Sequence, residues 1–417
     1  MGMGLPPLSV IVLVIAFVLI TFRRIGNIRL QIWQIVLGGA LAVMITGQVS
    51  PYEAASYIDL TVITFLLGIF IVGEALTESG YAQYLSYKIF KVASSVDELV
   101  LLVLLVMGFA SMFLLNDTIA VIVTPVVMIF AMRWRINPNL LLLSLAFAIT
   151  IGSVASPIGN PQNLIVASSG LVKDPFVAFF SYLLVPTAIN LAIAYLVLKA
   201  FYRKEFHREP LIHTRPPLKD KKLAGLCKLS LAIMAISVII YATVEVTDVP
   251  VSLSFSYIAV MAALPILIFS NKRLSLVANI DWRTIIFFMA LFVLVGSVWQ
   301  SGFLQNLIGS ANLNLGSVPT ILLVNVLGSQ LVSNVPMVLI YLKLLAYAHV
   351  STAEAMALAA GSTIAGNLFV FGAASNIIII QIAERKYDHV LSFVDFAKVG
   401  IVVTSLNVIV CWIFLAV

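Results

Sequence analysis

The residues of this 417-residue chain that could bind a ligand or carry a proton are one carboxylate and a set of amides and hydroxyls. All of them lie where long apolar runs are interrupted. The carboxylate is Asp117, in the run Asn116-Asp117-Thr118. A charge near the middle of a bilayer costs at least ~2.5–3.5 kcal/mol, which protonation or a bound cation would relieve. A carboxyl that alternates between an aqueous cavity and a closed state would therefore bind and release a proton, so Asp117 is the candidate for proton coupling.

A structural role for Asp117 stays open beside this chemical one. Asp is favoured at helix starts, where its carboxylate accepts hydrogen bonds from free backbone N–H groups. Asp117 would then cap the second helix of a hairpin, and the two roles can coexist.

The other polar residues at the interruptions are neutral. A helix that stops inside the membrane leaves up to four N–H or C=O groups without intrahelical partners, and its end carries roughly half a unit charge. Such ends bind ions or polar solutes, although a single Asn or Ser there also suits an interhelical hydrogen bond. The predicted substrate-binding residues are Asn116, Thr118, Ser156, Asn160, Gln162 and Asn163 in the first half of the chain and Ser333, Asn334, Asn367, Ser375 and Asn376 in the second, with Thr363 nearby.

The composition is that of an integral membrane protein. The chain is 62% hydrophobic and only 10% charged, with a mean hydropathy of +1.11, whereas about 25% of the residues in soluble proteins are charged. Its net charge of +6 is the ordinary result of basic cytoplasmic loops, so no nucleic acid partner is implied. With two cysteines and four histidines, the latter near predicted loops, we expect no disulfide framework, no metal site and no cofactor.

Apolar runs near the ~20 residues that a bilayer core requires predict single spans at 8–22, 30–46, 58–77, 176–201, 225–243, 254–270, 283–300 and 391–416. Two further runs, 98–132 and 316–345, have polar breaks near their middles. They predict hairpins, re-entrant because each half holds only roughly 15 mostly apolar residues. Two others, 139–168 and 353–383, predict discontinuous helices whose breaks must be buried in protein or line a wet cavity.

The distribution of basic residues predicts orientation, since Lys and Arg collect in cytoplasmic loops. With the N-terminus outside and each hairpin returning to its own side, the loops that carry Lys88, Lys91, Arg133 and Arg135, and the basic stretch 202–224, are all cytoplasmic. The loops on the other side carry mainly acids. We therefore expect a multi-pass protein of the inner (plasma) membrane with both termini outside.

The chain also repeats itself. An Ile-Asp pair followed by Gly 21 residues after the Asp occurs twice, at a spacing of 222 residues, and polar residues at the interruptions recur in the same order. Chance likeness between apolar helices is the alternative, and ordered polar matches argue against it. The matched positions are Asp59 with Asp281, Gly80 with Gly302, Asn116 with Asn334, and Asn163 with Asn376.

These matches predict two halves with five crossings each, an odd number, so the second half is inverted relative to the first. The predicted fold is an all-α polytopic membrane protein with about 10 transmembrane helices, two re-entrant hairpins and two discontinuous helices. Its parts are a first inverted repeat at 1–201, a basic cytoplasmic linker at 202–224 and a second inverted repeat at 225–417. This is the architecture of secondary transporters, whose sites lie where the breaks of the two halves converge.

The whole chain resembles the ion transporter superfamily, which includes dicarboxylate and citrate permeases, sodium/proton antiporters and arsenite efflux permeases. The run Leu115-Asn116-Asp117-Thr118-Ile119-Ala120 with Thr124-Pro125 after it, and the run Ser333-Asn334-Val335-Pro336, are most similar to the arsenical pump membrane protein family. The segment Gly159-Asn160-Pro161-Gln162-Asn163 departs from that family and resembles other anion permeases of the superfamily. The resemblance implies a scaffold that holds a mobile transport unit, with elevator-like alternating access.

The leading hypothesis is export of arsenite or antimonite, as neutral trihydroxides, by proton antiport through Asp117. The first alternative is a sodium- or proton-coupled permease for a small anion, a dicarboxylate or an inorganic oxyanion, held by half-helix N-termini. The second is a sodium/proton antiporter, which would be expected to use more than one intramembrane acid. A membrane enzyme is not indicated, because the sequence shows no catalytic triad, phosphate loop or metal cluster.

The predicted partners are the small-molecule substrate and the lipid bilayer. Some arsenite permeases also work with a cytoplasmic ATPase subunit, and the linker at 202–224 is where one would dock. Its charge, however, is also the ordinary mark of a cytoplasmic loop.

Overall fold

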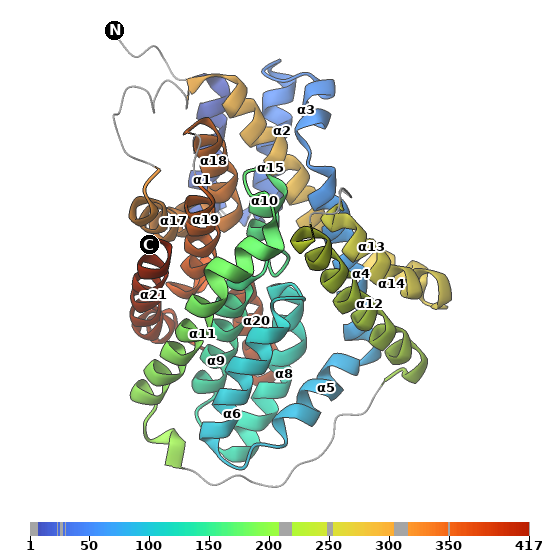
Figure 1. Cartoon of the computed structure of the whole chain (residues 1–417), viewed down its shortest axis with the longest axis vertical. Helices are drawn as coiled ribbons and strands as arrows, with labels where there is room; N and C mark the ends of the chain where they lie inside the picture. Colours follow the sequence, from blue (N-terminus) through green and yellow to red (C-terminus); the bar gives the residue numbers. More distant parts are fainter. Residues whose placement is uncertain are drawn as a thin grey trace.

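The computed structural model describes residues 7–22, 24–25, 28–29, 31–207, 219–247, 253–303, 316–348 and 351–416. Within these ranges the chain is helical (Figure 1), apart from a short antiparallel ladder of β1 (Arg24–Ile25) and β2 (Ile28–Arg29). Seven helices are long and apolar enough to cross a membrane, and shorter apolar helices pack beside them. The prediction of an all-α polytopic membrane fold is confirmed.

The helices of the first half of the chain follow one another with short connections. They are α1 (Leu8–Phe22), α2 (Ile32–Ile45), α3 (Pro51–Tyr57), α4 (Leu60–Ser79), α5 (Tyr81–Phe90), α6 (Val96–Leu102), the π-turn η1 (Val103–Met107), α7 (Gly108–Ala110), α8 (Asn116–Trp134), α9 (Pro138–Gly152), the 3₁₀ turn η2 (Ser153–Ala155), α10 (Pro161–Ser168), α11 (Pro175–Phe201) and the 3₁₀ turn η3 (Glu205–His207).

The second half repeats this order. Its helices are α12 (Lys221–Val246), α13 (Phe255–Phe269), α14 (Arg273–Asn279), α15 (Trp282–Gln300), α17 (Val318–Val332), α18 (Asn334–Ala348), α19 (Thr352–Ile364), the 3₁₀ turns η4 (Ala365–Asn367) and η5 (Val370–Gly372), α20 (Ala374–Tyr387) and α21 (Phe393–Leu415).

The residues that recur between the halves begin and end equivalent helices. Asp59 is the N-cap of α4, where its Oδ1 accepts hydrogen bonds from the backbone N–H of Thr61 at 2.9 Å. Asp281 is the N-cap of α15 and accepts from the N–H of Thr284 at 3.2 Å. At the other ends, Gly80 and Gly302 adopt φ values of 69° and 71°, a left-handed conformation that favours glycine. The recurring Asp and Gly therefore mark the start and the end of α4 in the first half and of α15 in the second.

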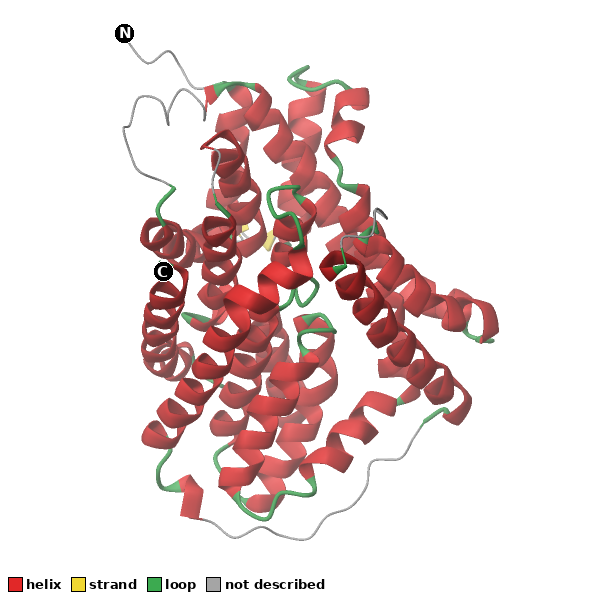
Figure 2. Ribbon diagram, in the orientation of Figure 1, coloured by secondary structure: helices red, strands yellow, loops and turns green. Residues whose placement is uncertain are grey.

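Both hairpins and both broken helices are present. The first hairpin turns between α7 and α8, and the second turns at Ser333 alone, between α17 and α18, with a φ of 75°. The first broken helix is α9 with η2 followed by α10, and the second is α19 with η4 followed by α20. Figure 2 shows green loops in the interior of the molecule as well as at its ends. Interior loops are tolerated at membrane depth only where protein or a wet cavity surrounds them.

Three details differ from the sequence-based expectation. α8 has 19 residues and is long enough to cross a membrane by itself, so the argument for re-entrance from helix length was wrong for this hairpin. Within the predicted linker 202–224, η3 covers Glu205–His207 and α12 already begins at Lys221; residues 208–218 lie outside the described residues. Short helices α3, α5 and α14 occupy stretches predicted as loops.

The early start of α12 has a local cause. Asp220 caps this helix by accepting a hydrogen bond from the N–H of Leu223 at 3.0 Å. That bond, with Lys272 adding to it, holds the pKa of the Asp220 carboxyl below its usual value. Lys272 Nζ lies 3.3 Å from Asp220 and 2.9 Å from Glu78 at the end of α4. These contacts join the end of α4 to the start of α12.

The helices pack in two groups. In one, α4 packs on α13, α13 on α12, and α15 on α2. In the other, α8 packs on α9 and α20, α11 on α21, and α17 on α19. The helix α5 leads from α4 in the first group to the hairpin of the second (Figure 1). The arrangement is compatible with a scaffold and a transport unit.

Close packing of the first hairpin against α9 depends on Gly152. A Cβ added there would overlap the backbone of Gly108 in α7. We expect Gly152→Ala to destabilise the protein by at least the ~1–3 kcal/mol typical of an overpacked core, because backbone cannot move aside as a side chain can. Thermal unfolding of the purified protein in detergent measures this.

The control is Gly38→Ala in α2, where an added Cβ meets nothing within 4 Å. This change should leave the melting temperature equal or raise it, since Ala favours a helix. Equal melting temperatures for the two variants would show that the hairpin does not pack against α9 as described.

Candidate functional site

Four helices begin in the interior, one after each interruption: α8, α10, α18 and α20. α8 packs along α20, and α10 packs along α18. The hydroxyl of Tyr387 in α20 donates to the carbonyl of Pro125 in α8 at 3.3 Å, and His389, just after α20, lies 2.7 Å from Asn139 in the helix that follows α8, so the C-terminal ends of α8 and α20 lie at the same end of the molecule. In Figure 1, α8 and α20 extend below the centre of the molecule, whereas α10 and α18 extend above it. The partly positive N-terminal ends of the helices therefore face a common central region.

One Asn holds each broken helix together across its break. Asn163 Nδ2 donates to the carbonyls of Ser153 and Ser156, both at 3.0 Å. Asn376 Nδ2 donates to the carbonyl of Gly366 at 2.7 Å. Both pairs, Asn163 with Asn376 and Ser153 with Gly366, are 213 residues apart. The equivalent Asn residues thus satisfy carbonyls that the interrupted helix leaves without partners.

The first break is closed by a network that reaches the other half of the chain. Asn160 caps α10 by accepting a hydrogen bond from the N–H of Asn163 at 2.9 Å. Its Nδ2 donates to Thr363 Oγ1 at 3.2 Å, and Thr363 Oγ1 donates to Asn163 Oδ1 at 3.0 Å. Ser153 Oγ accepts from Asn160 at 3.0 Å and from Asn116, at the tip of the first hairpin, at 3.2 Å. We call this set (Ser153, Asn160, Asn163 and Thr363) the closed break.

The equivalent positions in the second break differ at two residues, because Gly366 takes the place of Ser153 and Ala373 that of Asn160. The same spacing of 213 matches Thr363 with Thr150, Asn163 with Asn376, and Asn160 with Ala373. Alanine has no side chain that accepts a hydrogen bond, and α20 has no side-chain cap. Without that amide the network does not form. Within the described part of the chain, Thr150 Oγ1 and Asn376 Oδ1 have no hydrogen-bond partner.

Further unpaired polar atoms surround this second break. Asn367 Oδ1 and Nδ2 and Ser375 Oγ also have no partner among the described residues. Thr150, Asn367, Ser375 and Asn376 are each only 1% exposed. An unpaired buried polar group costs about 1–3 kcal/mol, so native proteins retain such groups where a ligand or water pairs with them. We call these four residues and the N-terminus of α20 the open break, and it is the candidate site.

Asp117 is the second residue of α8 and is partly exposed. It does not cap this helix, because the N-cap is Leu115 and no side chain caps α8. The capping alternative raised for Asp117 is therefore not what the structure has. Its neighbour Thr118 faces α4, where an added Cβ on Gly73 would lie 2.9 Å from Thr118 Oγ1. Asp117 thus lies at an uncapped helix start, at the contact between the two helix groups, where it interacts electrostatically with Asp281 at the start of α15.

The remaining predicted residues fall into two sets. Asn116 and Asn334, at the two hairpin tips, each have an Oδ1 without a partner in the described chain and are available to a ligand. Ser156 instead donates to the carbonyl of Met112 at 2.5 Å and ties the break to the hairpin turn. Ser333 forms the turn of the second hairpin, and Gln162 is buried in the first turn of α10.

Sequence reasoning missed Thr150, Ser153 and Gln330. Gln330 Nε2 donates to the carbonyl of Ala365 at 2.9 Å, which ties α17 to the second break. Thr150 could have been found by carrying the 213-residue spacing back from Thr363. Ser153 and Gln330 follow an apolar run or lie within one, where a single hydroxyl or amide gives no signal. Among the described residues, no three His, Cys, Asp or Glu side chains lie close enough together to hold a metal ion.

Comparison with known proteins agrees with this architecture. The YdaH transporter of Alcanivorax borkumensis has a similar fold, with a TM-score of 0.61 and 12% identity over 98% of this chain and 95% of that one. An uncharacterized transporter of Mycobacterium tuberculosis (strain H37Rv) is 27% identical over 98% of this chain and 97% of its own length. An uncharacterized transporter of Synechocystis is 24% identical over 91% of each chain.

The sequence profile of the citrate transporter family, CitMHS, matches residues 17–360. A closer relation to the arsenical pump family stays a prediction. Because the profile covers most of its length, this chain belongs to the citrate transporter family and is a membrane transporter.

Proposed function

We propose that the protein is a secondary active transporter that carries a small anion, a dicarboxylate or an inorganic oxyanion, together with protons. The observation that supports this most is that α8 and α20, which pack along each other, both begin in the interior without side-chain caps. Free N–H groups at a helix start, together with the helix dipole, bind anions. The family supports the same substrate class, since it is named for the transport of an organic anion.

The open break supplies the contacts for such an anion. The N–H groups of the first turn of α20 would donate to its oxygens, joined by the hydroxyls of Thr150 and Ser375 and by Asn367 Nδ2. These donors carry no full charge, so their hold on an anion is weaker than that of an Arg or Lys. A moderate affinity suits a transporter, because the bound anion must also be released.

Asp117 would couple the anion to a proton. Asp117 lies in the first turn of α8, which packs along α20, and this supports a role for it near the start of α20. Two like charges that lie close together in a protein repel each other, and this repulsion falls as their separation grows. An anion at α20 therefore favours the protonated form of Asp117, and a protonated Asp117 favours the anion, so the two would move together.

The orientation and the movement belong to the same proposal. The basic loops favour an inner-membrane protein with both termini outside. The division into two packed groups suits an elevator-like movement of the hairpins and broken helices against α4, α12, α13 and α15.

Export of arsenite and sodium coupling are the alternatives. Neutral amides and hydroxyls would also suit an uncharged trihydroxide, but the family match gives arsenite no support. Sodium would find side-chain oxygens at the open break, without the need for Asp117. Uptake of citrate, succinate, phosphate and arsenite by proteoliposomes, with either a proton or a sodium gradient, separates these cases.

The first prediction concerns Asp117→Asn. We expect this variant to bind the transported anion but to lose its acceleration by an inward proton gradient, because the amide cannot take up a proton. Anion uptake by proteoliposomes at a series of pH values measures this. Asp174→Asn, the same change at a residue that pairs with Lys173 at 3.8 Å on the surface, should behave as wild type. Full proton-driven uptake by the Asp117 variant would refute the coupling role.

The second prediction concerns Ala373→Asn, which gives α20 the cap that Asn160 gives α10. A new cap should stabilise the protein by about 1 kcal/mol and compete with the anion for the same N–H groups. We expect a higher melting temperature and at least a tenfold weaker affinity, equal to about 1.4 kcal/mol. A variant that is more stable yet binds the anion normally would place the anion elsewhere.

The third prediction compares two equivalent threonines. Thr363→Val leaves partners in the closed break unpaired and should cost about 1–3 kcal/mol of stability. Thr150→Val removes a hydroxyl that has no protein partner among the described residues, so it should change stability little and weaken anion binding. Melting temperature and anion affinity, measured for both variants, test this. The reverse pattern would contradict the assignment of the open break as the site.

A further inference from the structure

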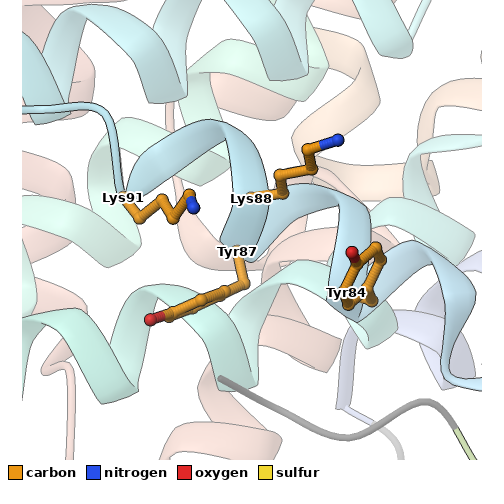
Figure 3. Close-up of a pocket in the computed structure, with 4 residues that line it drawn as sticks. All are labelled: Tyr84, Tyr87, Lys88 and Lys91. Carbon is orange, nitrogen blue, oxygen red and sulfur yellow. The ribbon is translucent and has the colours of Figure 1, made fainter. Parts of the chain in front are cut away.

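The short helix α5 has a hollow on one face. It is lined by Tyr84, Tyr87 and Lys88 of this helix and by Lys91 directly after it (Figure 3). α5 has ten residues, about 15 Å in length, which is too short to cross a bilayer. It follows α4 and leads to the first hairpin, so it connects the two helix groups.

One side of α5 packs on the protein and another is free. Tyr87 and Phe90 contact Phe130 of α8, with ring centroids 5.8 and 6.1 Å apart. Leu85 and Val92 are 37% and 72% exposed. Exposed apolar side chains next to lysines and a tyrosine are typical of a helix that lies at the membrane surface.

The nearby acids are already bound to other groups. Glu98 Oε2 accepts hydrogen bonds from Ser94 N and Ser94 Oγ, at 2.7 and 2.9 Å. Asp97 accepts from Lys199 Nζ at 2.8 Å and from the hydroxyl of Tyr195 at 2.7 Å. No acid occurs within α5 itself. In the described part of the chain, Lys88 and Lys91 therefore carry two positive charges without a carboxylate partner.

We propose that this hollow binds the phosphate group of an anionic phospholipid. The ammonium groups of Lys88 and Lys91 contact the phosphate, the hydroxyl of Tyr84 donates to it, and the acyl chains lie along Leu85 and Val92. The apolar neighbours favour a lipid over free phosphate, which would gain nothing from them. Each Lys near an anionic membrane surface contributes about 1 kcal/mol. Because α5 connects the two helix groups, the bound lipid holds this connection at the bilayer surface.

The test uses the full-length protein and does not depend on the transported substrate. Purified protein is titrated with phosphatidylglycerol or phosphatidylcholine in detergent, and lipid retention is measured by native mass spectrometry beside the melting temperature. Wild type should retain phosphatidylglycerol selectively and melt at a higher temperature with it. The double variant K88Q/K91Q should lose about tenfold or more of this selective retention.

The matched control is K221Q/K222Q, a change of two exposed lysines at the start of α12, which should retain the lipid as wild type does. Leu85→Ser tests the acyl contacts and should weaken retention without a change of charge. If K221Q/K222Q lost as much phosphatidylglycerol retention as K88Q/K91Q, the retention would be due to general surface charge. Displacement of the lipid by inorganic phosphate at equal concentration would identify a free phosphate site. Either result, or no preference for phosphatidylglycerol in wild type, overturns the proposal.

Discussion

The structure depends on the constraint that a helix broken inside a membrane must find partners for its exposed backbone groups within the protein. Lipid offers no hydrogen bonds, and each unsatisfied group costs several kcal/mol. The chain meets this demand with one Asn in each break. Asn163 and Asn376 donate to carbonyls at matched positions, Ser153 and Gly366. These hydrogen bonds stabilise the two broken helices. The N-terminal ends of four helices can therefore face the centre of the molecule.

The two breaks are not equally complete, and the difference gives the candidate site its location. At the closed break, Asn160 caps α10 and joins Thr363 and Asn163 in one network. At the open break, Ala373 takes the place of Asn160, and the matched hydroxyl and amide oxygens have no partner in the described chain. The closed break thus connects the two halves by hydrogen bonds, while the open break leaves polar groups that a ligand can bind. A site that binds and releases a ligand is expected to be incompletely satisfied by its own protein, as functional sites often are.

Much of the fold followed from the sequence, because helix boundaries and breaks leave local signals. Asp59 and Asp281 could be matched since an N-cap needs a side-chain acceptor at a fixed place, and Gly80 and Gly302 since a left-handed residue favours glycine. The polar runs at Asn116 and Asn334 marked the hairpin tips for a similar reason. The sequence did not distinguish an Asn that holds the backbone together from one that faces a ligand. Asn163 and Asn367 are the same residue type, but both polar side-chain atoms of Asn163 form hydrogen bonds, whereas those of Asn367 have no partner among the residues that the structure describes. That difference arises from contacts between residues roughly 200 positions apart, which no local pattern records.

The lack of a basic residue at the breaks is better understood as part of the mechanism than as evidence against an anion. A buried Arg or Lys would bind an anion strongly and would carry its own charge through the membrane after release. Helix starts and hydroxyls provide an electrostatic field that decays within about one helical turn. The binding free energy of an anion is then favourable enough for it to bind but small enough for it to be released. In the proposed mechanism, a carboxylate near these helix starts opposes entry of the anion by its charge, and protonation of that carboxylate removes the opposition. The coupling that we propose requires an acid close to a neutral site, and Asp117 is the candidate for that acid because α8 packs along the helix that begins at the open break.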